Sequence, residues 1–113
     1  MVALLALAEG DVHRSQDVLD KAHAAYTQGL AHLDEQDEPQ LRHRLELRLG
    51  DVALATRQLD RAMARYRDAA DGFGAHELPV REAWALLRLA RFAERPEAVI
   101  KAARERFEAA DLA

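Results

Sequence analysis

The chain has 113 residues, of which half are apolar and 32% are charged, with a formal net charge of −4 and no cysteine. This length suits one domain with a modest core, and the apolar fraction excludes an intrinsically disordered chain. The acidic balance argues against direct nucleic-acid binding, and the lack of cysteine excludes disulfides and thiolate metal sites.

The basic residues and the first segment suggest an origin and a compartment. Fourteen arginines stand against two lysines, a bias that is common in GC-rich bacteria. The apolar run from Val2 to Ala8 lacks a basic flank and is too short to cross a membrane. We therefore expect a cytoplasmic bacterial protein that does not contact the membrane.

Apolar residues recur at spacings of three and four along almost the whole chain, which predicts an all-α protein without strands. Pro39, Pro79 and Pro96 each follow a break in this pattern, and proline favours the first turn of a helix. Gly72 and Gly74 are predicted to end a helix, because glycine readily takes the left-handed conformation found there. The predicted helices cover, in chain order, residues 2–14, 18–34, 39–55, 59–71, 79–93 and 96–111.

The six helices are expected to pair as three antiparallel hairpins in a single domain, over about residues 1–35, 39–73 and 78–112. For the first hairpin an alternative stays open, in which Gly10-Asp11 is the turn and one long helix runs from Val12 to Asp34. The acidic loop between the first two hairpins is expected to be a hydrated linker. Its acidic residues are Asp34, Glu35, Asp37 and Glu38.

An internal repeat is the strongest signal in the chain. Residues 10–26 and 50–66 are identical at eight of seventeen positions, at an offset of 40. The shared residues include Gly10/Gly50, Asp11/Asp51, Leu19/Leu59, Ala22/Ala62 and Tyr26/Tyr66. A period of this length indicates stacked helical units that bury a core between neighbours and expose a long surface.

Residues 43–76 resemble a tetratricopeptide repeat (TPR). The matching positions are Leu49-Gly50, Ala53, Ala62, Tyr66 and Ala69, with Gly10, Ala22, Tyr26 and Gly29 matching in the first unit. Glu46 replaces the early Trp of the family, and a Gly-rich turn replaces its terminal Pro. The resemblance implies a TPR-like α-solenoid, and the 40-residue period resembles the TPR arrays of bacterial signalling regulators.

The TPR resemblance also implies a concave groove lined by the first helix of each hairpin, which binds a partner peptide or helix. The groove residues predicted in this way are Arg44, Leu47, Asp51, Leu54, Arg81, Trp84, Arg88 and Arg91. Arginine binds carboxylates and Trp84 adds apolar and cation–π contact, so the expected ligand is a protein or an acidic peptide. The alternative interpretation is a solvated arginine face on which Trp84 packs against the neighbouring hairpin.

The first helix is apolar on nearly every side, although the end of a repeat array should carry a polar face. Leu4, Leu5 and Leu7 are the residues that we expect to mediate self-association into a homodimer. Two alternatives stay open for this helix: the chain belongs to a longer solenoid, or the helix is covered within the domain.

No catalytic, metal or cofactor motif is present in the sequence. The five histidines (His13, His23, His32, His43 and His76) do not have the spacing of helical zinc ligands, so surface or capping roles are expected. There is no phosphate-binding loop, and Ser15 is the only serine. We therefore expect a non-enzymatic protein-binding scaffold, or alternatively a TPR sensor segment of a bacterial transcription or signal-transduction regulator.

Overall fold

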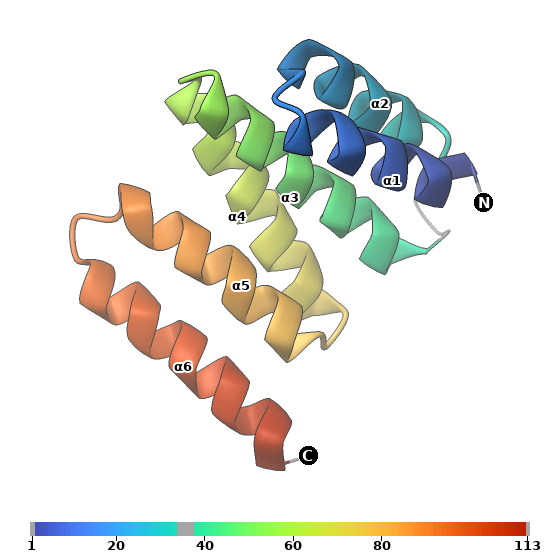
Figure 1. Ribbon diagram of the computed structural model, residues 1–113. Coiled ribbons are helices and arrows are strands. Elements are labelled where there is room, and N and C mark those ends of the chain that lie inside the picture. Colours follow the sequence, from blue (N-terminus) through green and yellow to red (C-terminus); the bar gives the residue numbers. More distant parts are fainter. Residues whose placement is uncertain (1, 34–37, 113) are drawn as a thin grey trace.

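Six α-helices account for nearly all of the computed structural model, which describes residues 2–33 and 38–112 (Figure 1). The helices are α1 (Val2–Ser15), α2 (Leu19–Ala31), α3 (Pro39–Ala55), α4 (Leu59–Ala75), α5 (Pro79–Leu89) and α6 (Pro96–Leu112), and a 3₁₀ turn (Ala90–Phe92) follows α5. These two ranges contain no strand. The all-α prediction and the count of six helices are confirmed.

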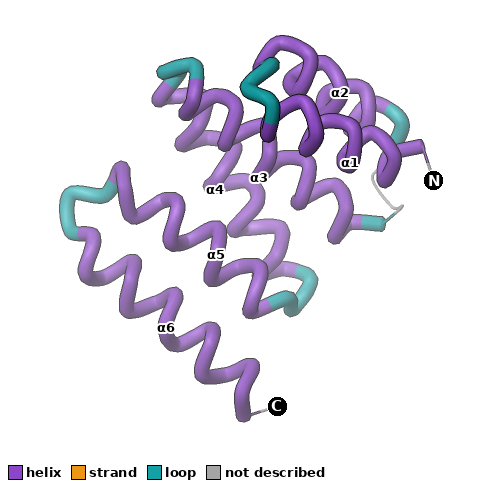
Figure 2. The backbone as a smooth tube through the Cα atoms, viewed as in Figure 1, coloured by secondary structure: helices purple, strands orange, loops and turns teal. Residues whose placement is uncertain are grey.

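Three of the connections are tight turns of one kind, which Figure 2 shows as short loops between long helices. Each turn places a non-glycine residue in the left-handed region: Asp17 (φ 62°), Arg57 (φ 62°) and Glu77 (φ 56°). The amide after each of these residues donates to a carbonyl five residues back, as in Gln58 N–H to the Ala53 oxygen at 2.8 Å. This Schellman arrangement satisfies carbonyl groups that the end of a helix would leave unpaired.

The turns decide between the predicted helix boundaries. Helix α1 continues through Gly10 and Asp11, so the alternative with a turn at these residues is wrong. The prediction that Gly72 and Gly74 end a helix is also wrong, because α4 runs through both to Ala75 and no glycine has a positive φ in the described residues. Gly72 instead gives room to a neighbouring ring, since a Cβ there would overlap the imidazole of His43.

Two other boundaries differ from the prediction by more than one residue. Helix α2 ends at Ala31 instead of residue 34. Helix α5 ends at Leu89 instead of residue 93, and the 3₁₀ turn Ala90–Phe92 follows it. Residues 34–37 of the predicted acidic linker lie outside the described residues, and Glu38 has a left-handed backbone (φ 41°) just before Pro39.

The core is divided between two clusters, and each joins one pair of helices to the first helix of the next pair. The first cluster consists of Ala3, Leu7, Ala22, Tyr26, Leu41, Leu45, Leu49 and Val52, from α1, α2 and α3. The second consists of Leu47, Ala53, Ala62, Tyr66, Ala69, Ala70, Phe73 and Ala85, from α3, α4 and α5. Helix α3 thus contributes opposite faces to both clusters.

The 40-residue sequence repeat is therefore also a repeat of packing. Tyr26 and Tyr66 are both completely buried, one in each cluster. Each tyrosine ring lies against a glycine, since a Cβ on Gly10 would overlap the Tyr26 ring and a Cβ on Gly50 would lie 2.7 Å from the Tyr66 ring. The helices follow one another in space in chain order, with α1 and α2 at one end and α6 at the other (Figure 1).

Candidate functional site

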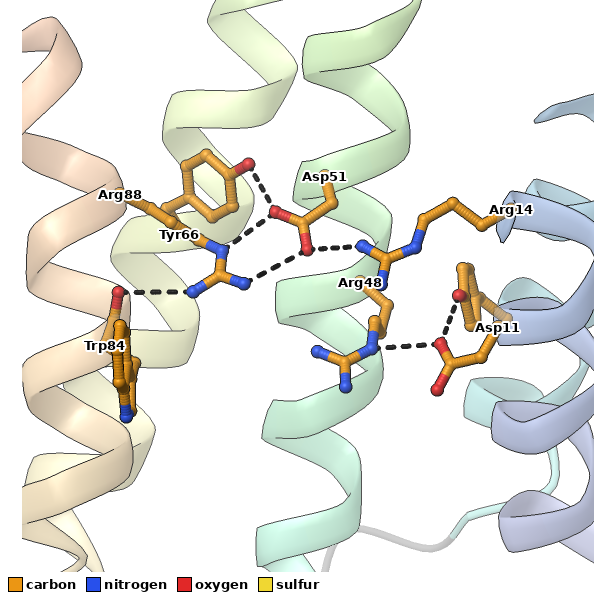
Figure 3. Close-up of polar contacts among 8 residues, drawn as sticks. Asp11, Arg14, Arg48, Asp51, Tyr66, Trp84 and Arg88 are labelled. Atoms are coloured by element: carbon orange, nitrogen blue, oxygen red, sulfur yellow. Dashed lines mark hydrogen bonds and ion pairs between the residues drawn. The ribbon is translucent and has the colours of Figure 1, made fainter. Parts of the chain in front are cut away.

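A polar network recurs along the helices, and it joins side chains from α1 to α5 (Figure 3). In the first unit, the Asp11 carboxylate accepts hydrogen bonds from the Tyr26 hydroxyl at 2.5 Å and from Arg48 Nε at 3.0 Å. In the second unit, the Asp51 carboxylate accepts from the Tyr66 hydroxyl at 2.7 Å and from Arg88 Nε at 2.9 Å. Each set links one pair of helices to the next through a single carboxylate.

Asp51 is the more heavily bonded of the two carboxylates. Its other oxygen accepts from Arg14 at 2.8 Å, and only 14% of the Asp51 side chain is exposed, against 38% for Asp11. Burial raises the pKa of the Tyr66 phenol, and its hydrogen bond to Asp51 raises it further, so Tyr66 stays a neutral donor. The predicted groove residues Asp51 and Arg88 are thus bonded to each other.

Two hollows lie beside this network, between α3 and α5. The larger, of about 420 Å³, is lined by Arg14, Asp51, Leu54, Tyr66, Trp84, Leu87, Arg88 and Arg91. The smaller, of about 210 Å³, is lined by Leu47, Arg48, Phe73, Arg81, Trp84 and Arg88. Trp84 and Arg88 line both hollows. Seven of the eight predicted groove residues therefore meet here, and only Arg44 does not line either hollow.

Trp84 is held on one side and open on the other. Its ring packs edge-on against Phe107 of α6, with the ring centroids 5.5 Å apart, and 52% of the residue is exposed. Its ring thus packs within its own pair of helices, and the hollows that it lines also carry residues of the neighbouring hairpin. An aromatic ring fixed by a neighbour and half open to solvent can contact a ligand at little cost in side-chain entropy.

Arginines outnumber carboxylates around the hollows. Six arginines lie in or beside them, namely Arg14, Arg44, Arg48, Arg81, Arg88 and Arg91, against the two carboxylates Asp11 and Asp51. Arg44, Arg81 and Arg91 form no ion pair with a described residue. Burial lowers the pKa of Arg44, and the charges of Arg81 and Arg48 lower it further, so these cations repel one another. Such a set favours an incoming anion.

Arg44 itself lines a different hollow of about 560 Å³, together with Leu4, Pro39, Leu41 and other residues. Among the described residues, its Nε is buried without a hydrogen-bond partner. Arg44 therefore lies outside the two hollows beside Trp84, and its charge acts on Arg48 and Arg81, which line the smaller of them.

The residues predicted for self-association divide into two groups. Leu4 and Leu5 are 49% and 60% exposed, whereas Leu7 is 3% exposed and belongs to the first core cluster. Leu7 was wrongly assigned to the surface, because the first helix is apolar on both sides and the sequence alone does not tell which side is covered.

His43 also departs from its predicted surface role. Its side chain is 12% exposed, its ring stacks on His76 at 5.4 Å, and it meets Phe73 edge-on at 5.6 Å. Burial lowers the pKa of His43, and the charges of His76 and Arg42 lower it further. Histidine at this position is a packing residue that stays neutral near pH 7.

Sequence reasoning missed Arg14, Arg48 and Tyr66 as members of the site. The signal that could have found Arg48 and Tyr66 is the repeat itself, since Asp11/Asp51, Tyr26/Tyr66 and Arg48/Arg88 all recur at the same offset of 40. Arg14 has no counterpart in the repeat, because Leu54 stands 40 positions after it. Three polar residue types that repeat together suggest a shared hydrogen-bond network.

A larger hollow, of about 680 Å³, lies between α2 and α4. Its floor is formed by the core residues Leu49, Val52 and Ala53, and its walls carry both charge signs, including Asp20, Asp68, Arg61 and Arg65. This hollow has charges of both signs, and no Phe, Tyr or Trp stands among the described residues that line it. The hollows beside Trp84 are therefore the better candidate for a binding site.

Two further properties bear on the kind of site. Over residues 2–33 and 38–112, no group of three or more His, Cys, Asp or Glu side chains is arranged to hold a metal ion. None of the helices in the described part of the chain combines the length and the apolar character that a membrane span requires.

Comparisons of the chain with protein-family models, with curated proteins and with solved structures found no match. The TPR resemblance and its functional implications therefore stay predictions that rest on the residues themselves.

Proposed function

We propose that this chain is a protein–protein interaction module, a short TPR-like solenoid without chemistry of its own, and that it binds an acidic segment of a partner protein. The observation that carries the proposal is the half-exposed Trp84, which stands among arginines that outnumber the nearby carboxylates. Arginine and tryptophan are the residue types most often found at binding hot spots.

The two hollows suggest what the bound segment contains. The smaller hollow has apolar walls from Leu47, Phe73 and Trp84, which suit one apolar side chain of the partner. Arg81 borders this hollow, and Arg91 borders the larger one. Each arginine can receive a carboxylate with paired hydrogen bonds. The preferred segment is therefore an apolar residue flanked by acidic residues.

The polar network supports this function by fixing the groove. Asp51 ties Arg14, Tyr66 and Arg88 together, so α1, α4 and α5 are held around α3 before any ligand arrives. A preorganised site loses less conformational entropy on binding. The same groove would serve the alternative function, that of a sensor segment in a transcription or signal-transduction regulator.

The test is a selection from a random peptide library on the immobilised chain, followed by titration of the selected peptides. Trp84 is the only tryptophan, so its intrinsic fluorescence reports occupancy of the groove directly. We expect enrichment of peptides with Asp or Glu beside an apolar residue, and an affinity that falls as salt is added.

Variants then locate the site. Arg81→Glu and Arg91→Glu should weaken binding at least tenfold, because each replaces an attraction by a repulsion. Arg88 is avoided, since its loss would also remove one of the two arginines that pair with Asp51 and so disturb the polar network. Arg104→Glu, an equal charge change on the exposed surface of α6, is the matched control and should bind as the original chain does. Peptides that show no acidic preference, or that bind the Arg81 and Arg91 variants equally well, would refute the groove.

A further inference from the structure

Helices α3 and α5 use one face to dock onto the preceding pair of helices. On α3 this face includes Leu45 and Val52, which are 0% and 2% exposed and belong to the cluster around Tyr26. On α5 and the turn after it, the residues 40 positions later are Ala85 and Phe92, which pack in the cluster around Tyr66. Positions that are equivalent at the offset of 40 thus form the docking face on both α3 and α5.

The same face of α1 is uncovered. The residues 40 positions before Leu45 and Val52 are Leu5 and Val12, which are 60% and 53% exposed. Ala8, also exposed, falls on the same stripe at 3.6 residues per turn, and Leu4 and Glu9 border it on either side. Helix α1 therefore presents an apolar docking face that no described residue of the chain covers.

The chemistry of this face does not match that of another repeat unit. Where α3 and α5 dock, Arg48 and Arg88 reach back to the aspartate of the preceding unit. The residue of α1 at that position is Ala8, so α1 lacks the arginine that would pair with such an aspartate.

The opposite end of the molecule does not match this face either. In the last pair of helices, Ala90, Arg91 and Arg106 stand at the Gly, Asp and Tyr positions of the repeat, and Arg106 is paired with Glu82 at 2.9 Å. A second copy thus finds no acceptor of the repeat's kind for its α1 at the α6 end. Head-to-tail assembly through the contacts of the repeat is therefore disfavoured, whereas face-to-face pairing of α1 with α1 needs no such acceptor.

We propose that two copies of this chain associate through α1 about a two-fold axis, with Leu5, Ala8 and Val12 at the centre of the contact. Leu4, Ala8 and Val12 form an i, i+4, i+8 ridge, the kind that interdigitates when two helices cross. The small Ala8 in the middle of this ridge allows the two helices to approach closely at the crossing point. An isologous contact of this type closes on itself and stops at a dimer.

The contact is small. The exposed parts of Leu4, Leu5 and Val12 amount to about 300 Å² of apolar surface on each copy, the lower end of the range for the largest apolar patch on a monomeric protein. Because specific stable interfaces bury about 1,600 Å² in total, the dimer should be weak and in exchange with the monomer.

The first experiment is sedimentation equilibrium on the full chain from about 1 to 500 µM, a range that brackets a weak dimer. The expected result is a monomer–dimer equilibrium. Leu5→Glu combined with Val12→Glu should give a monomer with unchanged helical circular dichroism, because both side chains are exposed. Leu59→Glu is the matched control, since Leu59 is 52% exposed on α4 and its replacement should leave the dimer intact.

A cross-linking experiment tests the geometry. The chain has no cysteine, so Ala8→Cys introduces a single thiol on the proposed axis. Mild oxidation should convert this variant to a covalent dimer far faster than Ala24→Cys, an exposed position on α2. A monomer at every concentration, a dimer that persists in the Leu5/Val12 double variant, or equal cross-linking at both positions would overturn the proposal.

Discussion

The close contact between Gly50 and Tyr66 gives a prediction that runs against helix propensity. In an exposed helix, Gly→Ala stabilises by about 0.8–1.0 kcal/mol. A Cβ on Gly50, however, would lie 2.7 Å from two carbons of the Tyr66 ring, whereas ordinary contacts begin near 3.4 Å. The completely buried ring would have to move by several tenths of an ångström, away from its hydrogen bond to Asp51.

The magnitude follows from these opposing effects. Overpacking a core costs about 1–3 kcal/mol, and a weakened hydrogen bond costs about 1 kcal/mol more, against the gain in propensity. We expect Gly50→Ala to lower the free energy of unfolding by about 1–3 kcal/mol. The measurement is urea denaturation followed by circular dichroism at 222 nm.

Gly74→Ala is the matched control for this experiment. Gly74 also lies within a helix, but the nearest atom to a Cβ there is the Glu82 carboxylate oxygen at 2.8 Å, the far end of a flexible side chain. We expect Gly74→Ala to stabilise by about 0.5 kcal/mol, because most of the propensity gain survives. If Gly50→Ala were as stabilising as Gly74→Ala, the close packing of Tyr66 would be refuted.

Three further predictions concern the turns, the network and the buried histidine. Arg57→Gly and Glu77→Gly should each raise the free energy of unfolding by about 0.5–1 kcal/mol, because glycine adopts positive φ without strain; destabilisation in urea melts would contradict this. Asp51→Asn should cost about 2 kcal/mol and Asp11→Asn about 1 kcal/mol, because Asp51 is less exposed and pairs with two arginines. If urea denaturation showed that both variants lose the same free energy of unfolding, Arg14, the additional partner of Asp51, would contribute nothing to stability. Burial lowers the pKa of His43 below its usual 6.5. As the pH drops, the unfolded chain therefore takes up a proton at His43 before the folded chain does. The free energy of unfolding should then fall between pH 7 and pH 5. In urea titrations at each pH, His43→Leu should flatten this fall, and an unchanged slope would exclude His43 as its source.

The helices were largely predictable from the chain alone. A spacing of three and four between apolar residues is a local property, and Pro39, Pro79 and Pro96 stand at helix starts in the structure as expected. The repeat at an offset of 40 also indicated, before any coordinates, that Tyr26 and Tyr66 would occupy equivalent places. These features depend on neighbours along the chain, so the sequence by itself determined them.

Only the tertiary structure decided which of these residues are free to act. Asp51 and Arg88 are 37 positions apart, and no local pattern tells that they pair with each other while Arg81 and Arg91 form no ion pair with a described residue. Likewise, only the packed structure shows that Gly72 lies inside α4 and gives room to the His43 ring from another helix. Burial and hydrogen bonding depend on which helix faces lie opposite one another, and that is settled when the six helices pack.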